Sequence, residues 1–156
     1  MARDLTRIRD KAGKEPEVCF TSIYHYVTDE DHLHASYRGL EPGKAPGTDG
    51  VTKEEYGADL EQNITDLARR LARMGYRPQP VQRVYIPKPG SDKKRALGIP
   101  CFEDKLVQRA VARVLEQIYE ADFLDSSYGY RPGRTCHQAL DELGRTIQRK
   151  KVSYVV

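Results

Sequence analysis

Residues Arg83 to Pro100 read RVYIPKPGSDKKRALGIP. In its first arm, Val84 and Ile86 alternate with polar residues, which is typical of a half-buried strand. A Pro-Gly pair at positions 89–90 predicts a turn, and a second arm with alternating apolar residues ends at Pro100. The pattern therefore predicts a β-hairpin.

The tip of this hairpin is strongly basic. Lys and Arg side chains carry charge and several hydrogen-bond donors each, so a basic loop held between two strands can bind phosphate groups. A basic turn that is only solvated has the same composition, and the residues alone leave both interpretations open. The charged residues of the tip are Lys88, Asp92, Lys93, Lys94 and Arg95.

Positive charge is concentrated around the hairpin. The net charge of the chain is only +3, yet nine Lys or Arg residues and one acid lie between Arg69 and Arg95. Local charge, rather than the sum, governs phosphate neutralisation and counterion release, so the segregation favours a polyanion partner. A helix face that is basic and exposed to solvent is the alternative.

The composition indicates one soluble domain. The chain has 156 residues, of which 38% are hydrophobic and 31% are charged. No apolar run approaches the roughly 20 residues that cross a bilayer, and the N-terminus lacks the apolar segment of a secretory signal. Cys19, Cys101 and Cys136 are far apart in the sequence, which predicts free thiols and a cytoplasmic location.

Helices are expected before the hairpin. Residues 1–19 are polar and aperiodic, and they predict a loose lead-in with a short helix at most. One or two helical turns follow from Phe20, and Thr28 or Asp29 can cap the next helix. His25, His32 and His34 lie in this region, but their spacing does not place them on one helix face, so no metal site is predicted.

A longer helix should lead into the hairpin. Thr52 and Glu55 match a capping box, and apolar residues then recur at steps of three and four up to Met74. This pattern predicts one helix of about five turns. Gly75 is expected to end it in the left-handed conformation.

After the hairpin, apolar periodicity predicts a core helix from Glu103 and another helix from Thr135 to about Lys150. On the first of these helices, three cations spaced four residues apart either line a groove or face solvent: Lys105, Arg109 and Arg113. Residues 152–156 have a strand pattern at which the chain stops. We expect the full-length protein to continue beyond it.

Two loops are candidates for ligand contacts. Residues 42–50 contain three glycines and two prolines, but they lack the Lys-Ser/Thr ending of a P-loop. A shaped lid and a rigid connector both remain open for this loop. Residues 124–134 interleave aromatic and basic side chains that can stack on bases and hold a phosphate backbone, or can instead pack into the protein. These side chains are Tyr128, Tyr130, Arg131 and Arg134.

Six motifs in a fixed order resemble one family. They are Phe20-Thr21-Ser22-Ile23, Ala45-Pro46-Gly47-Thr48-Asp49-Gly50-Val51, Tyr76-Arg77-Pro78 with Arg83-Val84-Tyr85-Ile86-Pro87-Lys88, Leu97-Gly98-Ile99-Pro100, Glu103-Asp104-Lys105-Leu106-Val107-Gln108, and Ser127-Tyr128-Gly129-Tyr130-Arg131-Pro132-Gly133-Arg134. Each motif alone is weak, but together they resemble the N-terminal, fingers part of bacterial group II intron-encoded reverse transcriptases, or maturases.

The resemblance implies an α+β fold, the helix-rich fingers subdomain of a right-hand polymerase with a basic β-hairpin and a small sheet. Residues 20–156 would form this subdomain after the 1–19 lead-in. Lys88 and Arg95 would contact the triphosphate of the incoming deoxynucleotide, where such groups act by positioning and charge stabilisation.

The resemblance also implies contacts to RNA. The loop at Thr48 and Asp49 would close over the template, and the 124–134 loop would hold the template strand. The residues expected to bind template or intron RNA are Thr48, Asp49, Arg83, Lys93, Lys94, Tyr128, Tyr130, Arg131 and Arg134. The implied partners are RNA, an RNA–DNA duplex and dNTP, with no membrane, and a homodimer through the fingers is left open. The implied location is cytoplasmic, associated with the nucleoid when acting on DNA.

The catalytic aspartates of this family, which hold two Mg²⁺ ions, have no counterpart before Val156. We therefore expect Mg²⁺ in the full-length enzyme, no catalytic or metal-binding residue in this chain, and no polymerisation by the chain alone. Two alternatives stay open: a non-catalytic module that recognises structured intron RNA, and an interaction module that dimerises through its helices.

Overall fold

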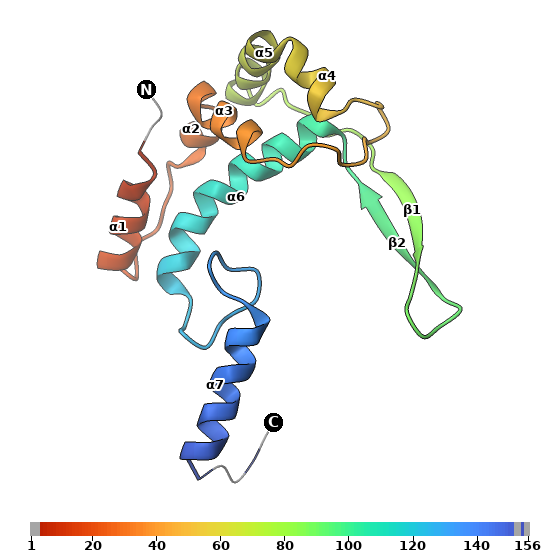
Figure 1. The fold of residues 1–156 in the computed structure, drawn as a ribbon. Coiled ribbons are helices and arrows are strands. Elements are labelled where there is room, and N and C mark those ends of the chain that lie inside the picture. The colour runs from red at the N-terminus through yellow and green to blue at the C-terminus, as the bar shows by residue number, and fades with distance from the viewer. Residues whose placement is uncertain (1–3, 152–153, 155–156) are drawn as a thin grey trace.

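The computed structural model describes residues 4–151 and 154. Helices α1, α2 and α3 pack against one long helix, α6, and a hairpin projects from beside its first turn (Figure 1). The elements in chain order are α1 Thr6–Lys14, α2 Tyr24–Val27, α3 Glu30–Arg38, α4 Lys53–Ala58, α5 Leu60–Ala72, β1 Gln82–Pro87, β2 Lys94–Ile99, α6 Phe102–Asp122 and α7 Cys136–Arg149. A helix-rich chain with a small antiparallel sheet confirms the expected α+β class.

The core lies along α6. Leu106, Ala110 and Val114 recur every four residues and are buried, as the apolar periodicity predicts. They pack with apolar side chains from α3 and α5, including Leu33 and Ile64, which are both inaccessible to solvent. The expected core helix after the hairpin is therefore confirmed.

The N-terminal segment is packed rather than loose. Ile8 and Ala12 of α1 are each only 4% exposed and belong to the apolar core, and α1 packs against α6. The short helix that the sequence allowed is present at residues 6–14, but the expectation of a loose lead-in is wrong there. The polar composition hid the pattern, because two apolar residues four apart are enough to seat a nine-residue helix.

The next helices begin where the sequence indicates. The Asp29 side chain accepts a hydrogen bond from the His32 amide, at 3.0 Å, and is the N-cap of α3. His32 itself is buried, and its Nε2 donates to the Ala110 carbonyl on α6 at 2.9 Å. His34 is placed elsewhere, 3.2 Å from a Glu61 carboxylate oxygen.

The expected helix of five turns is two helices. The capping box of Thr52 and Glu55 is present at the start of α4, but the backbone breaks at Asp59, whose φ of −118° and ψ of 42° are not helical. At the end of α5, Met74 is the left-handed residue, with a φ of 55°, and it is 68% exposed. The prediction that Gly75 takes this conformation and that Met74 faces the core is wrong.

The hydrogen bonds at the end of α5 explain why Met74, rather than Gly75, is the left-handed residue. The Met74 amide donates to the Leu71 carbonyl and the Gly75 amide to the Arg70 carbonyl, both at 2.9 Å. This pair of bonds is the Schellman motif. In that motif the left-handed residue directly precedes the residue whose amide donates to the carbonyl five positions earlier. Gly75 therefore serves as that donor.

The hairpin matches its predicted bounds. Strands β1 and β2 pair antiparallel, and the turn has Pro89 second and Gly90 third with a φ of 71°. The Ser91 amide donates to the Lys88 carbonyl at 3.2 Å, which is the arrangement of a type II turn. The strands are exposed along nearly their whole length, so the expectation of a half-buried strand is wrong.

Helix α7 extends beyond the far end of α6 (Figure 1). Thr135 and Gln138 form a capping box at its start, and none of its residues is buried. The strand expected at 152–156 falls largely outside the described residues. Across the described part of the chain, no helix has both the length and the apolar character needed to span a bilayer, and the three cysteines are free thiols.

Candidate nucleic-acid interface

The pairing of the two strands decides which hairpin side chains share a face. Val84 lies opposite Leu97, and Ile86 lies opposite Arg95. Residues directly opposite one another project from the same face, and alternate residues along a strand do too. One face of the ribbon therefore combines apolar residues with Arg95.

The basic side chains divide between the two faces. The Lys88 amide donates to the Lys93 carbonyl at 3.1 Å, so the ladder continues by one position beyond the strands. By the alternation of the ladder, Lys88 and Lys93 share the face of Arg95. Arg83 and Lys94 belong to the opposite face, because their positions alternate with those of Ile86 and Arg95.

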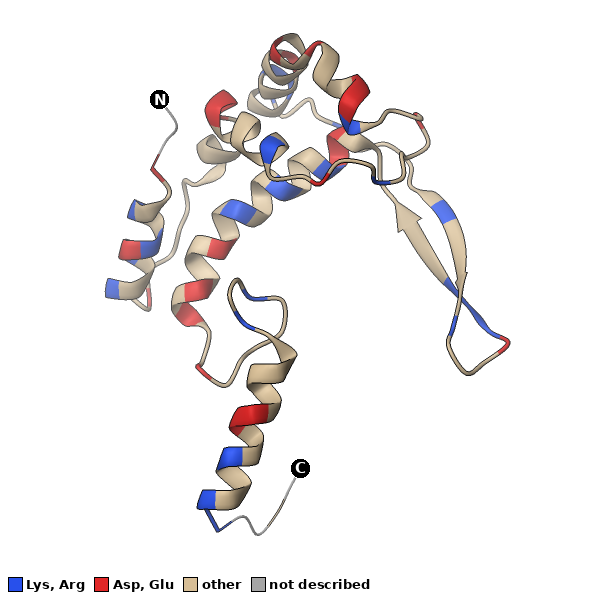
Figure 2. Ribbon diagram, viewed as in Figure 1, with Lys and Arg blue, Asp and Glu red and all other residues tan. Residues whose placement is uncertain are grey.

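The five hairpin cations are exposed and lack internal partners. Within residues 4–151, none of these side chains forms an ion pair or a hydrogen bond with another group of the protein. Figure 2 shows their positive charge along the projecting ribbon, with Asp92 as the acid at its tip. The set comprises Arg83, Lys88, Lys93, Lys94 and Arg95.

The arginines of α5 are different. Arg70 donates to both oxygens of Glu103, at 2.6 and 2.9 Å, and also to Asp66 at 2.7 Å. The pKa of Asp66 is lowered by hydrogen bonds from Arg70 and then Arg69. Arg69 and Arg70 are therefore paired with acids. Within residues 4–151, the uncompensated charge of the basic segment over residues 69–95 lies on Arg73, Arg77 and the hairpin cations.

The lead into the hairpin is fixed to α6. Asp104 is 5% exposed and accepts hydrogen bonds from the Tyr76 hydroxyl and, at 3.0 Å, from the Gln79 amide. Burial, and then the bond to Asp104, raises the pKa of Tyr76 well above its ordinary range. One buried carboxylate thus orients the chain where it enters β1. Sequence reasoning missed this role, because an acid in the first turn of a helix is already explained by the helix dipole.

The loop at 42–50 is seated on the base of the hairpin. The Thr48 hydroxyl donates to the Pro80 carbonyl at 3.0 Å and lies 3.3 Å from the sulfur of Cys101. The Asp49 carboxylate accepts from the Val51 amide at 3.2 Å, which closes a tight turn. The structure therefore brings Thr48 and Asp49, both predicted to contact RNA, next to the hairpin base.

The loop at 124–134 is organised around Arg131. Its side chain is 7% exposed, and its Nη2 pairs with Glu120 at 3.1 Å. It also donates to the carbonyls of Leu124 and Ser127, at 3.0 Å each, and lies 4.9 Å from the centre of the Phe123 ring. Most of the hydrogen-bonding capacity of Arg131 is therefore used within the protein.

The other predicted residues of this loop are more accessible. Tyr130 is fully exposed and has a left-handed φ of 57°. Arg134 lies 5.2 Å from the Tyr128 ring centre and 3.4 Å from an exposed Asp125 carboxylate oxygen. The Tyr128 hydroxyl donates to Glu142 of α7. Neither tyrosine packs into the core.

The two groups of predicted RNA-contacting residues lie at opposite ends of α6 (Figure 1). The hairpin base adjoins its first turn, and residues 124–134 follow its last turn. A 21-residue helix is about 30 Å long, so one ligand must be extended to reach both groups. Among the described residues, no three His, Cys, Asp or Glu side chains are grouped to hold a metal ion.

The chain is similar to a group II intron-encoded protein and to an intron maturase. No family model matches the chain. It is 40% identical over 94% of its length to the group II intron-encoded protein LtrA of Lactococcus lactis, and 37% identical over 83% of its length to protein YkfC of Escherichia coli. A 54-residue part is 41% identical to nuclear intron maturase 2, mitochondrial, of Arabidopsis thaliana.

The chain spans 24% of the length of LtrA, 34% of YkfC and 7% of the Arabidopsis maturase. The match to LtrA extends over nearly the whole chain, so it includes the hairpin, the Thr48 loop and α6 together. The chain belongs to the family of group II intron-encoded reverse transcriptases and maturases.

Proposed function

We propose that this chain is the fingers portion of an RNA-directed DNA polymerase, where it binds the RNA template and the incoming dNTP. The observation that carries the proposal is the projecting hairpin, whose cations are exposed and have no acidic partner within residues 4–151. Uncompensated charge of this kind favours a polyanion, since each phosphate neutralised releases counterions. Membership of the intron-encoded family supports the choice of nucleic acid.

The two faces of the hairpin suggest a division of roles. Lys88 and Arg95 share one face, so both can reach the same triphosphate. Their ammonium and guanidinium groups would position the phosphates and stabilise the charge that develops on the leaving diphosphate. Arg83 and Lys94 project from the opposite face, where they would contact the phosphates of an RNA strand. Lys93 shares the face of Arg95, but it lies beside the turn at the tip, where it would contact the same RNA strand as Lys94.

The loops would extend the RNA contacts along α6. The Thr48 loop adjoins the hairpin base, and the exposed ring of Tyr130 is available for stacking on a base about one helix length away. Arg131 would act as a positioning residue, since its side chain holds the loop that carries Tyr130. In this proposal the catalytic aspartates and their Mg²⁺ ions lie elsewhere in the full-length enzyme, and the chain alone does not polymerise.

RNA binding tests the first part of the proposal. We expect the affinity of the chain for a single-stranded RNA of about 20 nucleotides to fall about tenfold or more between about 50 and 200 mM salt. Lys93→Ala with Lys94→Ala should weaken binding and reduce the salt dependence. The matched control is Lys11→Ala with Lys14→Ala on α1, which removes the same charge from an exposed surface far from the hairpin. Equal effects of the two double variants would contradict the proposal.

The role of the hairpin in dNTP binding is tested in the full-length enzyme. Lys88→Ala with Arg95→Ala should raise the KM for dNTP in primer extension while leaving RNA affinity nearly unchanged. If primer extension keeps its normal dNTP dependence while the Lys93 and Lys94 variants still lose RNA binding, the module binds only RNA. That outcome would favour the non-catalytic alternative.

A further inference from the structure

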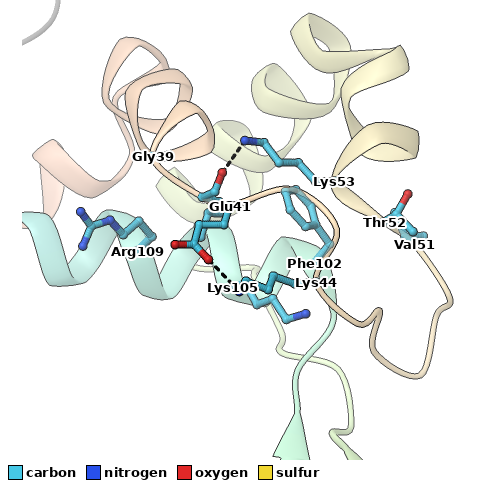
Figure 3. Close-up of a pocket in the computed structure, with 10 residues that line it drawn as sticks. Gly39, Glu41, Lys44, Val51, Thr52, Lys53, Phe102, Lys105 and Arg109 are labelled. Atoms are coloured by element: carbon cyan, nitrogen blue, oxygen red, sulfur yellow. Dashed lines mark hydrogen bonds and ion pairs between the residues drawn. The ribbon is translucent and has the colours of Figure 1, made fainter.

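A separate pocket of about 350 Å³ lies between the start of α6 and the 39–53 segment (Figure 3). Two parts of this segment line the pocket, residues 39–44 and residues 51–53, and we call them its two arms. It is distinct from the exposed ribbon of the hairpin, although the loop that carries Thr48 joins its two arms. The charged residues that line it are Glu41, Lys44, Lys53, Lys105 and Arg109.

These residues give the pocket an excess of positive charge. Its single lining carboxylate, Glu41, pairs with Lys44 at 2.7 Å, and both side chains are largely exposed. The other two lysines are held by backbone oxygens: Lys53 donates to the Leu40 carbonyl and Lys105 to the Ala45 carbonyl, the latter at 2.6 Å. A carbonyl does not neutralise an ammonium group.

Spare hydrogen-bond donors remain at the pocket. A lysine ammonium has three N–H donors, and the structure uses one of them at each of Lys44, Lys53 and Lys105. Arg109 points along α6, and its Nη1 lies 3.1 Å from Glu116, which compensates its charge, so the excess positive charge of the pocket rests on the three lysines. A phosphate oxygen accepts from several such donors at once.

The floor of the pocket is apolar. Phe102 lines it and is buried in an aromatic cluster, with ring centres 5.0 Å from Tyr56 and 5.9 Å from Tyr37. Leu40 and Val51 line it as well. A ligand that suits this site therefore combines an anionic group with a less polar body, as a nucleotide does.

We propose that this pocket binds the phosphate of a nucleotide, carried either by a free nucleotide or by an RNA strand. The inference goes beyond the proposed function, which uses the hairpin and the two loops. Occupancy would bridge both arms of the segment that holds the Thr48 loop. It would thus steady the loop against the hairpin base.

Chemical-shift titration of the ¹⁵N-labelled 156-residue chain tests the proposal with two probes, AMP and a six-nucleotide RNA without terminal phosphates. Adenosine is the control for AMP. We expect shifts at the amides of Gly39, Val51 and Thr52, which line the pocket. Shifts with AMP but not adenosine identify a free nucleotide as a source of the phosphate, and shifts with the RNA identify the strand.

Two substitutions with opposite expected effects on binding make the test more specific. Lys44→Ala should weaken binding at these amides about fivefold to tenfold, because one charge-assisted bond is lost. Glu41→Gln should strengthen it severalfold, because the competing carboxylate is removed. The Lys44–Glu41 pair is exposed, so neither change should threaten folding. Lys14→Ala and Glu17→Gln are the matched controls outside the pocket.

The proposal is overturned if neither AMP nor the RNA shifts the pocket amides, or if both pocket variants bind as the wild type does. The hairpin variant Lys93→Ala with Lys94→Ala separates this result from the proposed function. That variant should keep AMP binding at the pocket while losing affinity for longer RNA. Loss of AMP shifts in the hairpin variant would overturn the assignment of a separate site.

Discussion

Gly47 lies so close to Cys101 that a Cβ atom on Gly47 would be 2.5 Å from both the backbone N and the Cα of Cys101. No side chain other than hydrogen fits there without movement of the backbone. Since Cys101 lies two residues after the end of β2 and directly before α6, this contact seats the loop on the hairpin base. Thr48 adds its hydrogen bond to Pro80 next to this contact.

Gly47→Ala should therefore destabilise the protein. The added methyl group must displace either the loop or the start of α6, and overpacking of this kind costs about 2 kcal/mol. Denaturant unfolding measures the change. Gly13→Ala on α1 is the control: its Cβ would meet no atom within 4 Å, and removing a helical glycine should raise the stability slightly. Equal stability of Gly47→Ala and the wild type would contradict the close contact.

Met74→Gly should stabilise the end of α5. Met74 has a φ of 55°, a conformation that glycine adopts without strain, and its side chain is 68% exposed. Removing the strain should raise the free energy of unfolding by about 1 kcal/mol. Met74→Ala is the matched control, since it shortens the side chain but keeps a Cβ. An equal rise in the free energy of unfolding in both variants would show that the stabilisation does not come from relief of backbone strain.

Arg131 and Arg134 should differ sharply in their effects on stability. Arg131→Ala leaves Glu120 without its partner and frees two carbonyls, which should cost about 3 kcal/mol. Arg134 pairs with a fully exposed Asp125, so Arg134→Ala should cost about 0.5 kcal/mol or less. Thermal and denaturant unfolding of both variants decide the point. A similar cost for the two would show that Arg131 does not organise the loop.

Stability should decline as the pH falls below the ordinary pKa of histidine. Burial lowers the pKa of His32, and the nearby Arg113 charge adds to this, against opposing contributions from the Ala110 carbonyl and Asp29. The folded state therefore resists protonation of His32 while the unfolded state accepts it. The stabilisation is complete above about pH 6.5 and is lost as the pH falls from there towards the pKa of the folded state.

The variant His32→Gln isolates this effect. Glutamine can still donate to the Ala110 carbonyl but does not titrate, so its stability should vary less than that of the wild type between about pH 7.5 and 5.5. His137→Gln on the surface of α7 should retain the wild-type slope. Parallel pH profiles for the wild type and His32→Gln would contradict the role of this histidine.

Much of the local structure was predictable from the sequence. The capping boxes at Thr52 and Thr135 and the Pro89-Gly90 turn all involve residues a few positions apart. The apolar repeat of α6 depends only on helix geometry. The break at Asp59 was missed, because the apolar period runs on across it.

The candidate site was predictable in its composition but not in its pairing. A sequence lists cations without saying which ones have partners. Arg70 pairs with Glu103, 33 residues away in the sequence, whereas the hairpin cations have no acidic partner among the residues that the structure describes. Thr48 donates a hydrogen bond to Pro80, which lies 32 residues away in the sequence, and no sequence pattern indicates that contact.

Most helical segments, the capping box at Thr52, the basic hairpin and its turn follow from the sequence alone, because these features depend on backbone preferences and on neighbours within one or two turns. The packing of distant segments sets the remaining features: the hairpin stands exposed, Gly47 packs against Cys101, the side chain of Arg131 is largely enclosed, and four cations line one pocket. These features join residues from distant parts of the chain. Their partners are set by how the segments pack around α6.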